Sequence, residues 1–129
     1  PAHDRAGGGH LRGDVARRYA SGALAVIELH LRIRVPPERR RAFDAFLAEA
    51  TAYYESPGGI RIRLLENRAD PADLVEVVEY VSMEVFDADQ RRVEHDPIMR
   101  GYLARWRALL DGPPVVEVYE VRSGHAQRS

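Results

Sequence analysis

The stretch ELHLRIR, residues 28–34, alternates between aliphatic side chains and charged or titratable ones. The aliphatic positions are Leu29, Leu31 and Ile33, and the polar positions are Glu28, His30, Arg32 and Arg34. A period of two places the two sets on opposite faces of a β-strand. The aliphatic face belongs to a core. Where the polar face lies decides whether its residues are solvated or form a site.

Similar patterns predict the remaining strands and the first helix. Strands are expected over 24–35, 60–66, 74–81 and 115–121. Pro37 suits the first turn of a helix, and apolar residues then recur at helical spacing up to Tyr54, so a helix is expected over 37–55. The segment SPGG at 56–59 ends it.

The second helical region is expected in two pieces. Asp87 with Gln90 three residues later resembles a capping box, which predicts a short helix starting there. Asp96 followed by Pro97 predicts the start of a longer helix that ends near Gly112.

The element order β-α-β-β-α-β predicts an α+β, ferredoxin-like fold with an antiparallel sheet and its helices on one face. The ordered domain is expected over residues 23–122. Residues 1–22, with three consecutive glycines and no lasting period, are expected to form a flexible arm, and residues 123–129 a polar tail.

The face of the sheet without helices is predicted to mix charged and apolar side chains. We place Glu79 on this open face, because an unpaired carboxylate beneath packed helices costs several kcal/mol. The predicted members are Glu28, His30, Arg32, Arg34, Arg61, Arg63, Leu65, Val75, Val77, Glu79, Val81, Glu117, Tyr119 and Val121. This mixture suits a face that meets the sheet of a second copy and encloses a ligand-sized space.

Composition excludes several classes of protein. The chain has 129 residues, enough for one domain, and a formal net charge of -1, which does not favour nucleic acid or anionic lipid. There is no apolar run of about 18 residues to predict a membrane span. The absence of cysteine and lysine excludes thiolate and Schiff-base chemistry. We expect a cytoplasmic protein without a metal site or a dinucleotide-binding loop.

Three stretches resemble the antibiotic biosynthesis monooxygenase-like family of the dimeric α+β barrel superfamily. They are VVEYVSMEVFDADQRRVEHDPIM (77–99), YLARWRALLDGPP (102–114) and VVEVYEV (115–121). The resemblance implies a homodimer whose sheets form a barrel, with a pocket inside the barrel or between sheet and helices. Some members oxygenate polycyclic aromatic substrates without metal or flavin; others degrade haem, isomerise or cyclise. The haem-degrading branch carries an Asn, a Trp and a His, of which only His95 has a match here.

Two histidines are candidate general bases, because a pKa near neutrality suits proton transfer. His95, which precedes a predicted helix cap, is favoured over His30, which has carboxylates on its own face. The alternatives are a surface histidine at 95 and an interface histidine at 30. Trp106 is predicted to be a core residue.

The predicted substrate-binding residues are Arg32, Arg61, Arg63, Glu79 and Tyr119. A guanidinium fork matches an acidic or phenolate ligand. The alternative is that the arginines form cross-strand ion pairs with Glu28, Glu76, Glu79 and Glu117.

The function expected from these residues and the resemblance is a cofactor-independent, monooxygenase-like oxidation of a small aromatic, quinol or polyketide-like metabolite, with dioxygen as co-substrate. Cyclisation or isomerisation in the same pocket, or a non-catalytic dimer that binds a small molecule, are the alternatives.

Overall fold

The computed structural model describes residues 25–124 and has eight elements. In chain order they are β1 (Ile27–Arg34), the 3₁₀-helix η1 (Pro37–Arg39), α2 (Arg40–Glu55), β2 (Ile60–Glu66), β3 (Asp73–Tyr80), α3 (Met83–His95), α4 (Pro97–Ala108) and β4 (Val115–Glu120). The arm predicted at residues 1–22 lies outside the described residues, as do residues 125–129 of the predicted tail.

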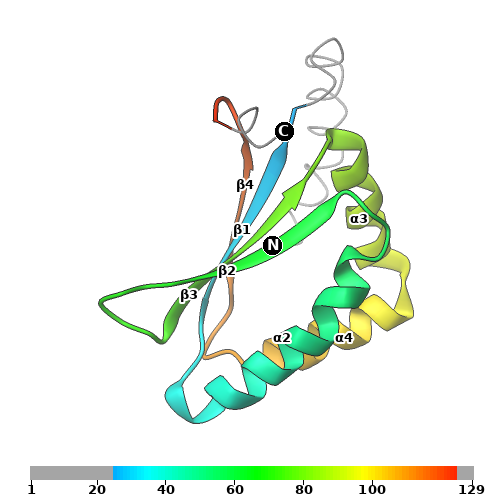
Figure 1. Cartoon of the computed structure of the whole chain (residues 1–129). Coiled ribbons are helices and arrows are strands. Elements are labelled where there is room, and N and C mark those ends of the chain that lie inside the picture. The colour runs from blue at the N-terminus through cyan, green and yellow to red at the C-terminus, as the bar shows by residue number, and fades with distance from the viewer. Residues whose placement is uncertain (1–24, 125–129) are drawn as a thin grey trace.

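The four strands form one antiparallel sheet in the order β2-β3-β1-β4. Figure 1 shows α2, α3 and α4 on the same side of this sheet, while the opposite face carries no helix. This is the ferredoxin-like α+β architecture predicted from the element order.

The strand register confirms how the sequence assigned residues to the two faces. Leu29 lies opposite Val78 on β3 and Val118 on β4, on the side that faces the helices. Glu28 lies opposite Glu79 and Tyr119, on the open face. The placement of Glu79 on the open face is therefore correct.

The helices bury their apolar stripes against the sheet. On α2, Phe43 and Phe46 are buried at helical spacing, and on α4 Met99 and Trp106 are buried in the same way. They pack with Ile33, Val35, Ala50, Tyr54, Leu74 and Leu110 into one cluster of buried side chains. This packing fixes α2 and α4 across the lower half of the sheet in Figure 1.

The prediction for the start of the second helical region was wrong. The first of its two helices, α3, begins at Met83 and has 13 residues, with Ser82 as its N-cap. The Ser82 hydroxyl accepts a hydrogen bond from the Val85 N–H, as N-cap serines do. Asp87 lies inside the helix. The capping motif read at Asp87 was a chance match, because the chain turns directly from the end of β3 at Tyr80 into the helix.

The cap predicted for the second of these helices is correct. The Asp96 side chain accepts from the Ile98 N–H, and Pro97 is the first residue of α4. Two glycines with positive φ, Gly58 and Gly59, form the turn between α2 and β2, where the sequence predicted a break. No helix among residues 25–124 is long and apolar enough to cross a membrane.

The homodimer expected from the sequence stays a prediction, and the open face is where it can be tested. Reversing charge there with Arg61→Glu and Arg63→Glu places new carboxylates beside Glu28 and Glu79. If two sheets meet at this face, the variant is expected to dissociate at concentrations where the wild type is dimeric, as sedimentation velocity will show.

The matched control is Arg91→Glu with Arg100→Glu, which changes the net charge equally on exposed positions of α3 and α4. It is expected to remain dimeric. A wild-type protein that sediments as a monomer at micromolar concentration contradicts the dimer.

Candidate functional site

A cavity of about 160 Å³ lies between the helix-covered face of the sheet and the helices. Its walls come from β1, β2, β3 and β4 on one side and from α2, α3 and α4 on the other. Most of the lining is apolar: Leu29, Leu31, Ile60, Ile62, Val78, Val93, Met99, Leu103, Trp106, Pro114 and Val116. A few polar groups converge on it, which is the usual character of a small-molecule site.

Glu76 of β3 is the central polar group of the cavity. Its side chain points toward the helices, its neighbours across the sheet are Leu31 and Leu64, and only 2% of the residue is exposed. The Trp106 indole Nε1–H donates to Glu76 Oε1 at 2.9 Å. Burial raises the pKa of Glu76 to about 7 against the opposing effect of this hydrogen bond. Near neutral pH the carboxyl can therefore both accept and release a proton.

Tyr54 of α2 supplies a second polar group to the same cavity. Its hydroxyl is buried and has no hydrogen-bond partner among the described residues. Burial raises the pKa of Tyr54, and the nearby Glu76 carboxylate raises it further. Tyr54 thus stays protonated and has a hydrogen bond to give to a bound molecule.

A polar network that includes two further lining residues, Tyr80 and Asp89, fixes the end of α2. The Tyr80 hydroxyl donates to Asp89 at 2.6 Å, and Arg92 pairs with the same carboxylate at 3.0 Å. Arg92 also donates to the carbonyl oxygens of Tyr53 and Tyr54, at 3.0 and 2.6 Å. These carbonyls belong to the last turn of α2, where backbone acceptors lack helical partners. The network therefore holds Tyr54 in place relative to α3.

The combination can remove a proton from a weakly acidic ligand and stabilise the anion that forms. The pKa of the Glu76 carboxyl is about 7, so it can take up a proton at neutral pH. The pKa of Tyr54 is raised, so its hydroxyl keeps its proton and can donate a hydrogen bond. The apolar walls strengthen both interactions, since they exclude water.

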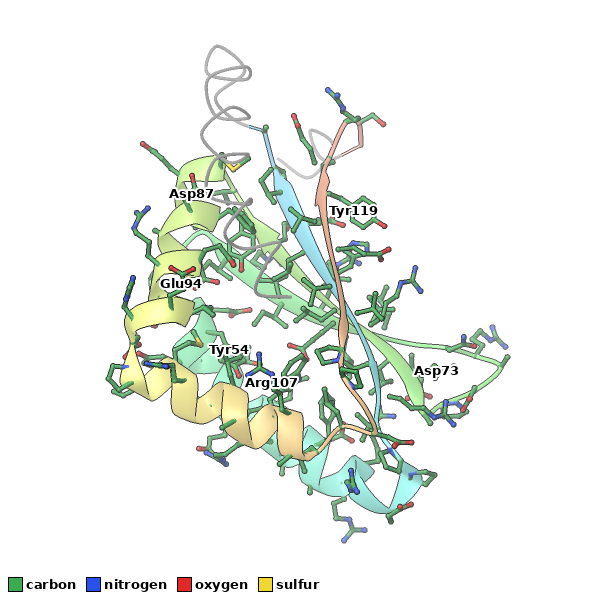
Figure 2. All side chains as sticks on the ribbon, turned by 180° about the vertical axis from the view of Figure 1, so that it is seen from behind. Tyr54, Asp73, Asp87, Glu94, Arg107 and Tyr119 are labelled. Carbon is green, nitrogen blue, oxygen red and sulfur yellow. The ribbon has the colours of Figure 1, made fainter. Side chains whose placement is uncertain are left out.

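The structure places most of the site residues predicted from the sequence on the open face, on the other side of the sheet. His30 Nε2 lies 2.9 Å from Glu28 Oε1, and the His30 ring contacts that of Tyr119 at 4.8 Å between centroids. Figure 2 shows Tyr119 on the opposite side of β4 from Tyr54 and Arg107. None of these open-face residues lines the cavity described above.

The alternative of cross-strand ion pairs is realised for two of the arginines. Arg32 pairs with Glu117 at 3.0 Å, and Arg63 lies 3.6 Å from Glu28. Arg61 and Glu79 are opposite each other in the register. Glu76, which the sequence also offered as a partner, cannot reach these arginines because it lies on the helix side of the sheet.

His95 is the last residue of α3, and its side chain is 78% exposed. Its nearest carboxylate is Glu94, at 3.8 Å. His95 and His30 do not share a site, and neither lines the cavity. The catalytic roles predicted for the two histidines stay predictions and are tested below.

The comparisons with known proteins identify the family. A sequence model described as antibiotic biosynthesis monooxygenase matches residues 26–99, more than half of the chain. The chain belongs to the antibiotic biosynthesis monooxygenase family. No curated protein gives a significant match.

Solved structures show the same fold at low sequence identity. SnoaB of Streptomyces nogalater, described as a cofactor-independent oxygenase, is 19% identical with a TM-score of 0.61, and the match covers 78% of this chain and 96% of SnoaB. A conserved protein of Methanosarcina mazei is 14% identical with a TM-score of 0.65, covering 77% and 95%. A Bacteroides thetaiotaomicron protein described as a possible oxidoreductase is 19% identical with a TM-score of 0.61, covering 77% and 100%.

In this member of the family, the sequence contains a signal for the position of Glu76. Glu76 and Glu79 are three residues apart on one strand, so they must point to opposite faces. Placing Glu79 on the open face therefore places Glu76 beneath the helices. Tyr54 gave no comparable signal, because its position in the helix predicts only that the ring is buried.

Trp106 is a core residue, as predicted, and its indole N–H also donates a hydrogen bond to Glu76. Within residues 25–124 no three His, Cys, Asp or Glu side chains are grouped to hold a metal ion.

The raised pKa of Glu76 predicts how the stability of the protein depends on pH. The Glu76 carboxyl binds a proton more tightly in the folded state than in the unfolded chain. Protonation of Glu76 therefore adds to the free energy of unfolding. This contribution is fully present below about pH 4 and is lost as the pH rises through 7. The difference between the two pKa values corresponds to a loss on the order of 3 kcal/mol. We expect Glu76→Gln to melt at a higher temperature than the wild type at pH 8 and to lose this advantage at pH 5.

The control is Glu79→Gln, the same substitution on the same strand but on the open face. Glu79→Gln is not expected to show a higher melting temperature than the wild type at pH 8 that disappears at pH 5. Equal melting temperatures for Glu76→Gln and the wild type at both pH values would show that the Glu76 carboxyl is not destabilised in the fold.

Proposed function

We propose that this protein oxidises a small phenol, or the enol form of a small ketone, with dioxygen in the cavity between sheet and helices. Glu76 takes the hydroxyl proton, and the electron-rich anion then reacts with dioxygen. For phenol itself the balance is one phenol and one dioxygen giving one p-quinone and one water. The observation that carries the proposal is a buried carboxylate with a pKa of about 7 in a cavity whose lining is mostly apolar.

The proposed chemistry requires little of the protein beyond proton transfer, positioning and the exclusion of water. The substrate supplies the electrons, so the proposal includes no resident cofactor and takes dioxygen as co-substrate. Membership of the monooxygenase family supports it, and so does the description of SnoaB as a cofactor-independent oxygenase. The homodimer and the cytoplasmic location expected from the sequence belong to the same proposal.

The anion needs a hydrogen-bond donor, and Tyr54 is placed to supply one. Its hydroxyl is unpartnered among the described residues, and Tyr54 lines the same cavity as Glu76. A fixed donor aimed at developing negative charge is among the largest contributions a site makes.

Oxygen consumption tests the proposal directly. We will supply phenol, 1-naphthol and anthrone, which span one to three rings, and follow dioxygen uptake with quinone formation. The rate is expected to fall as pH drops below about 7, because Glu76 must be unprotonated to act as the base. Glu76→Gln is expected to lower kcat/KM by roughly 10²- to 10⁴-fold, the usual contribution of a positioned base.

His95→Ala and His30→Ala serve as the comparison for Glu76→Gln. If Glu76 is the base, both histidine variants keep wild-type rates. A loss confined to His95→Ala or His30→Ala would instead support the role predicted from the sequence. Turnover without oxygen uptake would identify a cyclase or isomerase, and binding without any turnover would identify a binding protein.

A second prediction concerns Tyr54→Phe, which removes only the unpartnered hydroxyl. Because no hydrogen bond among the described residues is lost, the free energy of unfolding is expected to stay the same or rise by about 1 kcal/mol. The rate is expected to fall by roughly 10²-fold, as for the loss of one oxyanion donor. Steady-state kinetics and urea unfolding measure the two effects.

Tyr102→Phe is the matched control, since its ring packs against that of Tyr54 at 5.9 Å but does not line the cavity. Equal rates for the wild type and Tyr54→Phe would remove the donor role from Tyr54.

A further inference from the structure

The volume of the cavity limits the size of what it can hold. At about 160 Å³ it matches the engineered cavities of about 150 Å³ that accept one benzene ring. Sites for larger, drug-sized ligands occupy about 300 Å³ or more. A single aromatic ring fits the space, whereas two fused rings need the walls to move.

Arg107 is the one cationic side chain among the described residues that line the cavity. It lies in the last turn of α4, and Figure 2 shows it between that helix and the sheet, on the same side as Tyr54. Within residues 25–124 it forms no ion pair, whereas Arg105, two residues earlier, is held by Glu49 through two hydrogen bonds of 3.0 Å. The guanidinium of Arg107 is therefore available to a ligand.

Arg107 belongs to the open end of the cavity. Arg107 is exposed, and Val116 of β4, which also lines the cavity, is 49% exposed. The preceding residue, Trp106, is buried and reaches Glu76 at the closed end. The exposed Arg107 and the buried Glu76 therefore lie at different depths of the cavity. The site thus has a proton acceptor and a donor inside and a cation at its mouth.

This arrangement matches a molecule with a hydroxyl at one end and an anion at the other. A guanidinium binds a carboxylate through two parallel hydrogen bonds, which fixes orientation as well as adding affinity. We propose that the substrate is a single-ring aromatic acid whose phenolic hydroxyl meets Glu76 and Tyr54 while its carboxylate is bound by Arg107. This inference rests on the proposed function for the role of Glu76, and it assigns Arg107 the selection of the substrate.

Binding can be measured without turnover, because Trp106 is the only tryptophan of the chain and lies in the cavity wall. The probes are 4-hydroxybenzoate, phenol and 6-hydroxy-2-naphthoate, followed by Trp106 fluorescence and by titration calorimetry in the absence of dioxygen. We expect 4-hydroxybenzoate to bind at least about tenfold more tightly than phenol, as for a hydrogen bond to a charged group. It should also bind more tightly than the two-ring acid.

Two arginine variants test whether Arg107 causes the preference for 4-hydroxybenzoate over phenol. Arg107→Gln is expected to bind 4-hydroxybenzoate at least about tenfold more weakly than the wild type and phenol equally well. Arg100→Gln removes the same charge from an exposed position of α4 outside the cavity and is expected to bind like the wild type. Thermal melts confirm that each variant is folded.

The wild-type ligand series decides the proposal even if a variant misfolds. Equal affinities for phenol and 4-hydroxybenzoate would overturn the role of the acid group, and tighter binding of the naphthoate would overturn the limit to one ring. A preference for the acid that survives Arg107→Gln would overturn the assignment of Arg107. If the preference for the acid holds but phenol, 1-naphthol and anthrone, whose reacting carbons are unsubstituted, cause no oxygen uptake, the acid-binding site stands and the oxygenase proposal fails.

Discussion

The hydrogen bond from the Trp106 indole to the Glu76 carboxylate is the interaction on which the site depends. It joins α4 to the middle of the sheet and fixes the one carboxylate that β3 turns toward the helices. A single N–H donor contributes about 1.5–3 kcal/mol to a charged acceptor, less than burial of a carboxylate costs. Desolvation therefore prevails over the hydrogen bond, and the pKa of Glu76 rises to about 7.

The stability of the fold around the cavity comes from residues other than the cavity's own polar groups. Glu76 and the unpartnered hydroxyl of Tyr54 both reduce stability, because each is buried without a full set of partners. Two clusters of buried apolar side chains, around Phe43 and around Phe86, offset this cost. Arg92 adds a rigid frame by joining α3 to the end of α2. The fold thus places its least stable polar groups where the proposed chemistry needs them.

The sheet separates the charged residues of the open face from those on the helix side. The sequence alone grouped Glu76 with the open-face glutamates as possible partners of the arginines. On the open face, pairs such as Arg32 with Glu117 are exposed, and exposed pairs contribute about 0–1 kcal/mol. On the helix side, Glu76 is buried among aliphatic side chains, and Asp89 of α3 is buried beside Tyr80 and Arg92. The difference comes from the surroundings and not from residue type, because glutamates on the open face have charged or titratable partners, as Glu117 has in Arg32 and Glu28 in His30. The alternation of β3 predicted the face of each glutamate, but the consequence for Glu76 required knowing that helices cover that face.

The sequence by itself determined the order of elements, the two faces of each strand and the cap at Asp96, because these depend on local periodicity and on hydrogen bonds between near neighbours. It also carried the family resemblance that the family match confirms. Only the tertiary structure decided that α3 starts at Met83, that His95 is exposed, and that Glu76, Tyr54 and Arg107 line one cavity. These three residues come from β3, α2 and α4, and their proximity follows from how helices pack on the sheet. No local pattern contains that packing, since it depends on contacts between segments distant in the chain.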